Sequence, residues 1–384
     1  MLGKKKLLVH GGARDRYQLA LALCENNLLK YLVTDDYILR RQKPAELNKF
    51  VKTSYCALIL SVLYKVFPYA RINIVKDQFL SRYANRLVKN QTDIDVIAYS
   101  YYASYVFSHF KGKKILFQLH PHPVSVRNIF LNEIKQNPLS KISLIKEHEL
   151  IMKPGELKKL SDESQLADCI IVSSGFTKRT LVENGIKPEK ITIVPYGVDQ
   201  DSFKQKERYE RVDNILKVIF VGSWNQRKGL SYLAQAIKDL QLNGLNIHLT
   251  LVGRGIMDKN LVLQYELNNV EYLTDVPFED LIKFYHQADV FALPSLCEGF
   301  GHVILEAMSC GLPVITTENT AGADIILEGV NGFIVPVNDV KMLSKRLSYL
   351  YDNPKENIEI GKQAAITAKK LTWEKFRDNI VAAL

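Results

Sequence analysis

The sequence has few cysteines, and none are spaced as pairs. Five of its 384 residues are cysteine, and no two of them form a C-x-x-C motif. An odd number of thiols without paired spacing argues against a disulfide framework and against a zinc site. We therefore expect reduced thiols in a cytoplasmic protein. The thiols are at Cys24, Cys56, Cys169, Cys297 and Cys310.

The sequence also lacks a long hydrophobic run. No segment reaches the roughly 18 apolar residues that a membrane-spanning helix needs. After the first lysines only residues 7–9 are apolar, which predicts a short strand and not the core of a secretion signal. The closest stretch is CALILSVLYKVF, residues 56–67, which Lys65 interrupts. Basic clusters flank it, so two interpretations stay open: an amphipathic element on an anionic membrane, or a core helix with a solvated basic face.

Negative charge is scarce in the first part of the chain. Residues 1–160 hold 27 Lys and Arg against 12 Asp and Glu, a net charge of +15. Since the whole chain has a net charge of +10, residues 161–384 have a net charge of −5. The basic part is expected to meet something anionic, such as a nucleic acid, a lipid surface or an acidic ligand. No nucleic-acid motif and no stacking platform of aromatic residues is visible, so we predict no nucleic-acid partner.

Short apolar runs alternate with helical patterns in two successive series, which predicts an α/β protein with parallel sheets covered on both faces. A chain of 384 residues fits two domains. A segment with Pro and Gly at 195–203 separates the series. We predict two doubly wound domains: residues 1–196, completed by a terminal helix within 366–384, and residues 197–365.

A basic pair follows the first strand of the second series. This strand, residues 216–221, ends at Gly222, and Arg227 and Lys228 precede a predicted helix. Ligands of parallel sheets bind beyond the carboxyl ends of the strands. Because cations at a helix start oppose the helix dipole, a purely structural role is disfavoured. We predict that the pair holds a diphosphate.

Two glutamates in the segment PSLCEGFGHVILEAMSCGLPVI, residues 294–315, are eight positions apart. Glu298 is in a glycine-containing loop, and Glu306 is in the helix that follows. The glycines let backbone approach a ligand, and the start of the helix attracts phosphate. If Glu298 caps the helix, Glu306 lies two turns along the same face, where the pair suits two sets of ligand hydroxyls. The alternative is a cap and a buried ion-pair partner.

Together these segments resemble a retaining glycosyltransferase of family 4, also called glycosyl transferases group 1, which has the GT-B architecture of two facing Rossmann-like domains. The resemblance covers residues 170–340, through VSSGFTKRTL, IVPYGVD, VGSWNQRKGLSYLAQAI, the Glu298–Glu306 block and EGVNGFIVP. It implies that Glu298 lies at the donor sugar hydroxyls beside the reacting centre, as a catalytic residue. It implies that Glu306 binds the hydroxyls of the nucleotide ribose.

The same resemblance implies the phosphate contacts. Lys228 would bind the diphosphate, and backbone N–H groups would bind the distal phosphate. Many members have Arg directly after the strand-ending glycine, where this chain has Ser223, so Arg227 is expected to supply that charge. The backbone donors would come from Phe300, Gly301 and His302.

The N-terminal domain is expected to complete the cleft. Residues 10–25 predict a glycine loop and a helix that starts at Arg16. Gly11 and Gly12 would face the donor diphosphate, and Arg14 and Asp15 are candidate contacts at the helix start.

Two histidines follow an apolar strand in FQLHPHP, residues 117–123. By resemblance, His120 would touch the donor sugar and act as a catalytic residue with Glu298, and His122 is a candidate contact for the donor or the acceptor. No third ligand has suitable spacing, so we predict no metal. Adjacent Asp35 and Asp36 fit a turn better than a metal-binding D-x-D motif.

The predicted reaction moves a hexose-type sugar, with retention, from a nucleotide-diphosphate sugar to an acceptor hydroxyl, without metal or other cofactor. Glu298 would orient the sugar, and the leaving phosphate would take the acceptor proton. The basic domain indicates a cell-envelope or lipid-linked glycan acceptor at the inner face of a membrane. A nucleotide-sugar epimerase, a phosphorylase, an inert partner subunit and a basic-surface binding protein are the alternatives. The nucleotide base is expected near residues 274–277.

Overall fold

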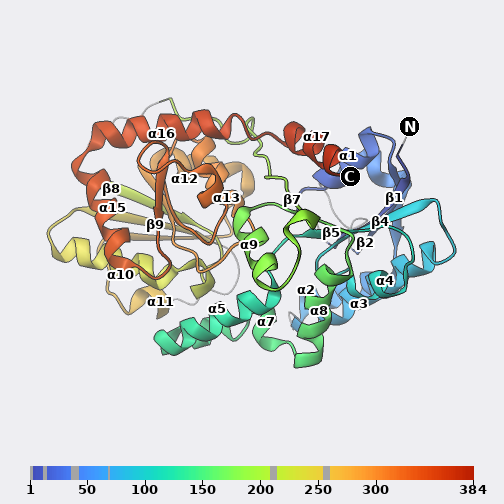
Figure 1. The fold of residues 1–384 in the computed structure, drawn as a ribbon. Coiled ribbons are helices and arrows are strands. Elements are labelled where there is room, and N and C mark those ends of the chain that lie inside the picture. The colour runs from blue at the N-terminus through green and yellow to red at the C-terminus, as the bar shows by residue number, and fades with distance from the viewer. Residues whose placement is uncertain (1–2, 12–14, 36–42, 68–69, 208–213, 254–259) are drawn as a thin grey trace.

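The computed structural model describes residues 3–11, 15–35, 43–67, 70–207, 214–253 and 260–384. They form two parallel β-sheets, each wrapped by helices (Figure 1). This confirms the predicted class, an α/β protein of two doubly wound, Rossmann-like domains.

The first sheet has seven strands in the order β3-β2-β1-β4-β5-β6-β7, and all its pairings are parallel. Its central strands are continuous apolar runs because helices cover both faces; all six residues of β4 are buried. The strands are β1 Lys5–Val9, β2 Leu29–Thr34, β3 Val51–Thr53, β4 Ile94–Tyr99, β5 Lys114–Gln118, β6 Cys169–Val172 and β7 Ile191–Ile193.

The second sheet has six strands in the order β10-β9-β8-β11-β12-β13, again with parallel pairings. The strand order reverses between β8 and β11, and ligands of such sheets bind beyond the carboxyl ends of the strands at that point. The strands are β8 Leu216–Val221, β9 Ile247–Gly253, β10 Val270–Thr274, β11 Val290–Leu293, β12 Val314–Thr317 and β13 Gly332–Val335.

Helices pack around both sheets. Those in the first part of the chain are α1 Gln18–Glu25, α2 Tyr55–Val66, α3 Ala70–Val88, α4 Ser104–His109, α5 Pro123–Gln136, α6 Lys141–Leu144, α7 His148–Ile151, α8 Pro154–Leu166 and α9 Gly175–Glu183. Those in the second part are α10 Leu230–Leu242, α11 Asn260–Leu263, α12 Leu281–Gln287, α13 His302–Ser309, α14 Gly322–Ile325, α15 Val340–Asp352, α16 Pro354–Ala368 and α17 Trp373–Ala383.

The chain crosses between the domains at two places that lie side by side. Val198 forms a parallel bridge with Thr372, and its N–H donates to the carbonyl of Leu371 at 3.0 Å. A Cβ on Gly197 would come within 2.3 Å of the Thr372 carbonyl carbon, so glycine is required there.

After the second crossing the chain returns to the first domain. There α17 packs against α1, as the red and blue helices of Figure 1 show. The Nε of Arg377 lies 2.9 Å from a carboxylate oxygen of Glu25.

The structure corrects one local prediction and narrows another. The first helix begins at Gln18 and not at Arg16, because Arg16 and Tyr17 have φ of 53° and 63°, in the left-handed region that a helix excludes. For residues 56–67, where two interpretations were open, the structure has a helix, α2, over Tyr55–Val66, and its described exposed side chains are apolar. Among the described residues, no helix has both the length and the hydrophobicity needed to cross a membrane.

Candidate functional site

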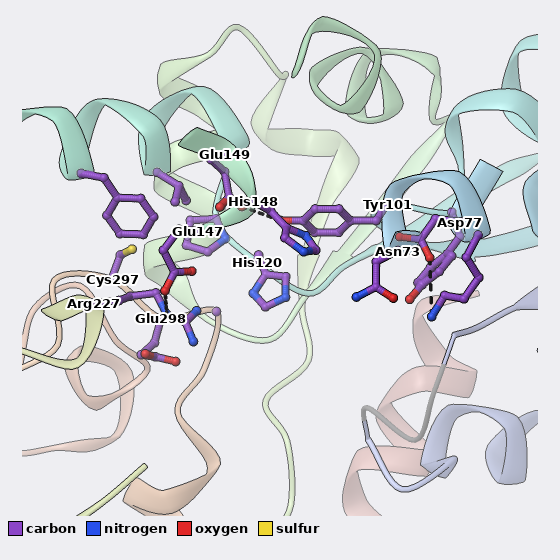
Figure 2. Close-up of a pocket in the computed structure, with 16 residues that line it drawn as sticks. Asn73, Asp77, Tyr101, His120, Glu147, His148, Glu149, Arg227, Cys297 and Glu298 are labelled. Atoms are coloured by element: carbon purple, nitrogen blue, oxygen red, sulfur yellow. Dashed lines mark hydrogen bonds and ion pairs between the residues drawn. The ribbon is translucent and has the colours of Figure 1, made fainter. Parts of the chain in front are cut away.

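A cavity of about 220 Å³ lies where the two domains meet. Figure 2 shows Glu298, Arg227 and Glu147 grouped at one end, His120 in the middle, and Asn73 and Asp77 at the other end. Arg227 and Glu298 come from the second domain, whereas Glu147, His120, Asn73 and Asp77 come from the first, so the cavity exists only because the domains face each other.

The centre of the site is a buried ion pair. The Nζ of Lys228 lies 2.7 Å from the Oε1 of Glu298, and both side chains are about nine-tenths buried. Burial opposes ionisation of Glu298, but Lys228 and Arg227 outweigh it and hold the pKa of this carboxyl below its usual range. The site therefore holds a carboxylate and two cations that are largely shielded from solvent.

Arg227 is shared between the domains. It belongs to the short 3-10 turn Gln226–Lys228 that follows β8, and its Nε lies 3.7 Å from a carboxylate oxygen of Glu147, which directly precedes α7. Asn225 donates to the same oxygen at 3.2 Å. Burial raises the pKa of Glu147, and Arg227 opposes that rise. The predicted basic pair thus lies in the cleft, and each of its members faces a carboxylate.

The loop that carries Glu298 is held by the opposite domain. The carbonyl of Gly299 accepts hydrogen bonds from the hydroxyls of Ser174 at 2.6 Å, Thr177 at 3.2 Å and Ser173 at 3.3 Å. A Cβ on Gly299 would lie 1.8 Å from the carbonyl oxygen of Leu119, so only glycine allows this close approach.

The start of α13 forms the next wall of the cleft. Gly301 precedes the helix, and His302 is its first residue. The His302 ring stacks on Tyr196 with the centroids 4.4 Å apart, and burial lowers its pKa to about 4. Phe300 places its ring against Tyr196, so only its backbone is positioned for a ligand.

A second cavity, of about 250 Å³, surrounds Glu306. Burial raises the pKa of Glu306 to about 7, although Arg16 opposes the rise and the Tyr285 hydroxyl donates to it at 3.1 Å. Phe278 lines this cavity with Arg16 4.2 Å above its ring, directly after the segment in which we expected the base. Glu298 and Glu306 therefore lie at separate parts of the cleft.

The N-terminal glycine loop is described only in part. Gly12 and Arg14 lie outside the described residues. Gly11 is buried against the Tyr102 ring. Asp15 lines the second cavity, but its carboxylate is already held by Tyr99 at 2.6 Å and by the N–H of Leu19 at 2.9 Å.

Two other candidates, His122 and Ser223, line neither cavity. The nearby His120 does line the first cavity. His122 is instead buried, with its Nε2 3.0 Å from the Ser161 hydroxyl. Burial lowers the pKa of His122 to about 4. Ser223 is exposed and lines neither cavity.

Several residues of the cleft were not expected from the sequence. Asn73, Lys76 and Asp77 of α3 line the far end of the first cavity, and residues 147–149 line its side. Tyr101 also lines it, and its hydroxyl donates to Glu149 at 2.5 Å. The only signal was the charged run KEHEL, residues 146–150, in a segment without clear periodicity.

No cluster of three or more His, Cys, Asp or Glu side chains able to hold a metal occurs in the part of the chain that the structure describes. Metal independence stays a prediction.

Comparisons with known proteins identify the two halves separately. The family described as Glycosyl transferases group 1 matches residues 201–367, and the family described as Glycosyltransferase Family 4 matches residues 42–202. An uncharacterised glycosyltransferase of Methanocaldococcus jannaschii is 30% identical over 212 residues, which are 54% of this chain and 57% of that protein. The capsular polysaccharide biosynthesis glycosyltransferase CapM of Staphylococcus aureus is 29% identical over 229 residues, 56% of this chain and 59% of CapM. The matches thus span little more than half the length of these curated relatives.

Solved structures match the whole fold. Sucrose-phosphate synthase of Thermosynechococcus elongatus has a TM-score of 0.71 at 17% identity, over 99% of this chain and 98% of that one. Anabaena Alr3699/HepE, solved with UDP-glucose, has a TM-score of 0.65 at 16% identity, over 99% and 98%. At such low identity the likeness shows the GT-B fold alone.

Proposed function

Because family models match residues 42–202 and 201–367, the chain belongs to the glycosyl transferases group 1 family, and from this we propose that it transfers a hexose-type sugar from a nucleotide-diphosphate sugar to an acceptor hydroxyl. The observation that carries the proposal is the buried pair of Lys228 and Glu298 in the cleft between the domains. A ligand that supplies both a diphosphate and sugar hydroxyls satisfies both members of this pair.

The diphosphate binds Lys228 and Arg227. The Lys228 side chain is 11% exposed and that of Arg227 is 24% exposed, so solvent screens their interaction with phosphate only in part. The start of α13 adds backbone N–H groups that attract the distal phosphate. These groups stabilise the negative charge that develops on the leaving diphosphate, which is the task that a metal performs in other transferases.

The nucleoside occupies the second cavity. Glu306 accepts hydrogen bonds from the ribose hydroxyls, and the base lies near Phe278. This arrangement places the sugar end of the donor near Glu298 and His120, which line the first cavity. The relative solved with UDP-glucose supports a uridine nucleotide as the first donor to test.

The transfer proceeds with retention and without a covalent sugar–enzyme bond. The bond between the sugar anomeric carbon and the phosphate oxygen breaks, and a bond from that carbon to the acceptor oxygen forms on the same face. The acceptor proton passes to the phosphate oxygen that leaves. Glu298, held by Lys228, orients the sugar hydroxyls and does not attack.

The acceptor is a cell-envelope or lipid-linked glycan, and the protein acts in the cytoplasm at the inner face of the membrane. The relation to a capsular polysaccharide glycosyltransferase supports this acceptor class. The acceptor binds at the wall of the first cavity that α3 and α7 form. The residues of α3 lie at the end away from Arg227, and those of α7 lie along the side of the cavity.

The first test is a thermal-shift panel of UDP-, GDP- and ADP-sugars, because any ligand of the native state raises its melting temperature. We expect one base to be preferred, and the diphosphate sugar to stabilise more than the matching monophosphate. The selected donor is then incubated with cell-envelope glycans. Three other products would replace the proposal with another reaction. Free sugar alone would indicate hydrolysis, and interconverted donor epimers would indicate epimerisation. Cleavage that requires phosphate would indicate phosphorolysis. The absence of any stabilising nucleotide sugar would overturn it.

A further inference from the structure

Helix α2 exposes large apolar side chains to solvent, whereas a surface helix normally buries them. Its buried side includes Ala57 and Ser61, whereas its exposed side is an apolar stripe. Ile59 is 60% exposed and Val66 is 63% exposed, although both are large aliphatic side chains. The stripe, which we call the α2 stripe, consists of Tyr55, Cys56, Ile59, Val62, Leu63, Val66 and Phe67.

The spacing of the stripe is helical. Positions 55, 59, 62, 63 and 66 fall on one face, and none of them is charged. Single apolar residues are normal on protein surfaces, but a contiguous apolar face marks an interaction site. The helix has 12 residues, which is too short to span a bilayer and sufficient to lie in its interface.

We propose that the α2 stripe inserts into the surface of an anionic membrane. The surrounding charge favours this occupant. Residues 43–89 contain nine Lys and Arg and only two acidic residues, a net of +7, and of the two acidic residues Asp77 is buried. An apolar face inside a basic surface is the combination that binds anionic lipid. A second copy of the chain would bring the same positive charge against itself.

Exposed cations lie on both sides of the helix in the chain. Lys49 precedes it, Arg82 and Arg86 are on α3, which packs against it, and Lys89 directly follows α3. Arg71, at the start of α3, is exposed as well but pairs with Glu156 at 2.6 Å. Lipid headgroups meet such cations while acyl chains cover the apolar side chains between them.

The stripe is connected to the far end of the first cavity. On the inner side of α2 the Ser61 hydroxyl lies 3.3 Å from a carboxylate oxygen of Asp35, and the Nζ of Lys76 lies 2.8 Å from the same oxygen. Lys76 lines the cavity beside Asn73 and Asp77, both on α3. The end of the cleft that lies away from Arg227 (Figure 2) is thus linked through Lys76 and Asp35 to the inner side of α2, whose outer side meets the proposed membrane. On the proposed function, the acceptor is then anchored in that membrane.

The membrane step is tested by flotation of the full chain with vesicles of phosphatidylcholine mixed with phosphatidylglycerol, and with phosphatidylcholine alone. We expect binding to the anionic vesicles, with loss as salt is added. The double variant Ile59→Glu/Leu63→Glu should bind at least about tenfold more weakly, since it places two anions in the inserted face. Leu242→Glu is the matched control, because Leu242 is 73% exposed at the end of α10 in the other domain, and it should bind like the wild type.

Equal flotation of the double variant and the wild type, or no flotation of the wild type, overturns the membrane proposal. Sedimentation velocity tests whether a second copy of the chain covers the α2 stripe instead. A dimer of the wild type that is absent in the double variant would assign the stripe to a second copy. Circular dichroism and melting temperature establish that the double variant is folded.

The acceptor class is tested separately from the proposed function. The thermal shift with the selected nucleotide sugar should be the same in the double variant and the wild type. With radiolabelled donor and cell membranes, label should enter the solvent-extractable lipid fraction, and the double variant should lose most of this transfer. Undiminished transfer by the double variant overturns the membrane-anchored acceptor. Vesicle binding without any nucleotide-sugar binding would overturn the proposed function and leave the membrane surface standing.

Discussion

Lys228 and Glu298 are 2.7 Å apart, Nζ to Oε1, and each is buried where the two domains meet. The two residues come from loops after neighbouring strands, β8 and β11, and Arg227 adds a second positive charge near Glu298. Removing Glu298 leaves Lys228 without its carboxylate, whereas removing Lys228 leaves Glu298 with Arg227 alone, in a site largely shielded from solvent. The pair is therefore coupled in stability and, on the proposed function, in donor binding.

A double-mutant cycle measures this coupling. Glu298→Ala should lower the free energy of unfolding by about 3–5 kcal/mol, because it leaves Lys228 buried without its carboxylate. Lys228→Ala should lower it by less, because Arg227 still faces Glu298. The double variant should be less destabilised than the sum of the two by about 1–3 kcal/mol. Denaturant unfolding gives all three values. Additive losses would show that the two charges do not depend on each other.

The same lysine should distinguish the nucleoside diphosphate from the nucleoside alone. Lys228→Ala should weaken binding of the nucleoside diphosphate about 10- to 100-fold, since a hydrogen bond to a charged group contributes about 1.5–3 kcal/mol. Binding of the matching nucleoside should change little. Calorimetric titration measures both. A similar loss for the nucleoside alone would mean that Lys228 acts through the fold.

Glu306 should make stability and nucleotide affinity depend on pH in opposite directions. Burial raises the pKa of Glu306 to about 7, so from about pH 4.5 to 7 the folded state holds a proton that the unfolded state has lost. The free energy of unfolding should therefore fall by up to about 3 kcal/mol over this range from this group alone. Glu306→Gln should remove that part of the pH dependence.

Nucleotide binding should follow the reverse trend. If ionised Glu306 accepts from the ribose hydroxyls, affinity increases as pH rises through about 7, and in Glu306→Gln it is weaker and lacks this increase. Titrations at several pH values compare the two proteins. The same pH profile in both would remove Glu306 from the nucleotide site.

The hydroxyls that bind the Gly299 carbonyl should matter for catalysis more than for folding. Ser174→Ala removes the shortest of these hydrogen bonds and should cost about 1 kcal/mol. Gly299→Ala forces the loop away from Leu119 and should abolish transfer. Ser344→Ala, whose hydroxyl makes a long 3.5 Å contact within the second domain, is the control. Activity unchanged in both site variants would show that this loop contact is dispensable.

The sequence predicted those parts of the molecule that local pattern determines. Alternating apolar runs gave both parallel sheets, and a basic pair after β8 and a carboxylate after β11 meet because parallel strands bring their carboxyl ends to one edge. Residues 98–107 are rich in tyrosine, and local pattern could not indicate which of these side chains are in the core. Tyr99 is in the core, whereas Tyr101 lines the cleft.

Tertiary packing determined the rest. The acceptor-side wall comes from α3 and α7, and their polar residues have no spacing that marks them. His122 and His120 are two positions apart at one strand end, yet only His120 faces the cavity, because His122 turns to Ser161 of α8. The first helix starts late because Arg16 and Tyr17 take a conformation that propensity disfavours.

The paired crossings at Val198 and Thr372 act as a pivot at one edge of the cleft. The cavity around Glu306 is lined by Gly197, Val198 and Trp373, so it adjoins the pivot, whereas none of these residues lines the cavity of Glu298. Rotation of the domains about this edge changes the first cavity more than the second. On the proposed function, opening the domains would therefore disturb the nucleoside pocket less than the acceptor side. The two substrates should accordingly bind in a fixed sequence, with the nucleotide sugar first.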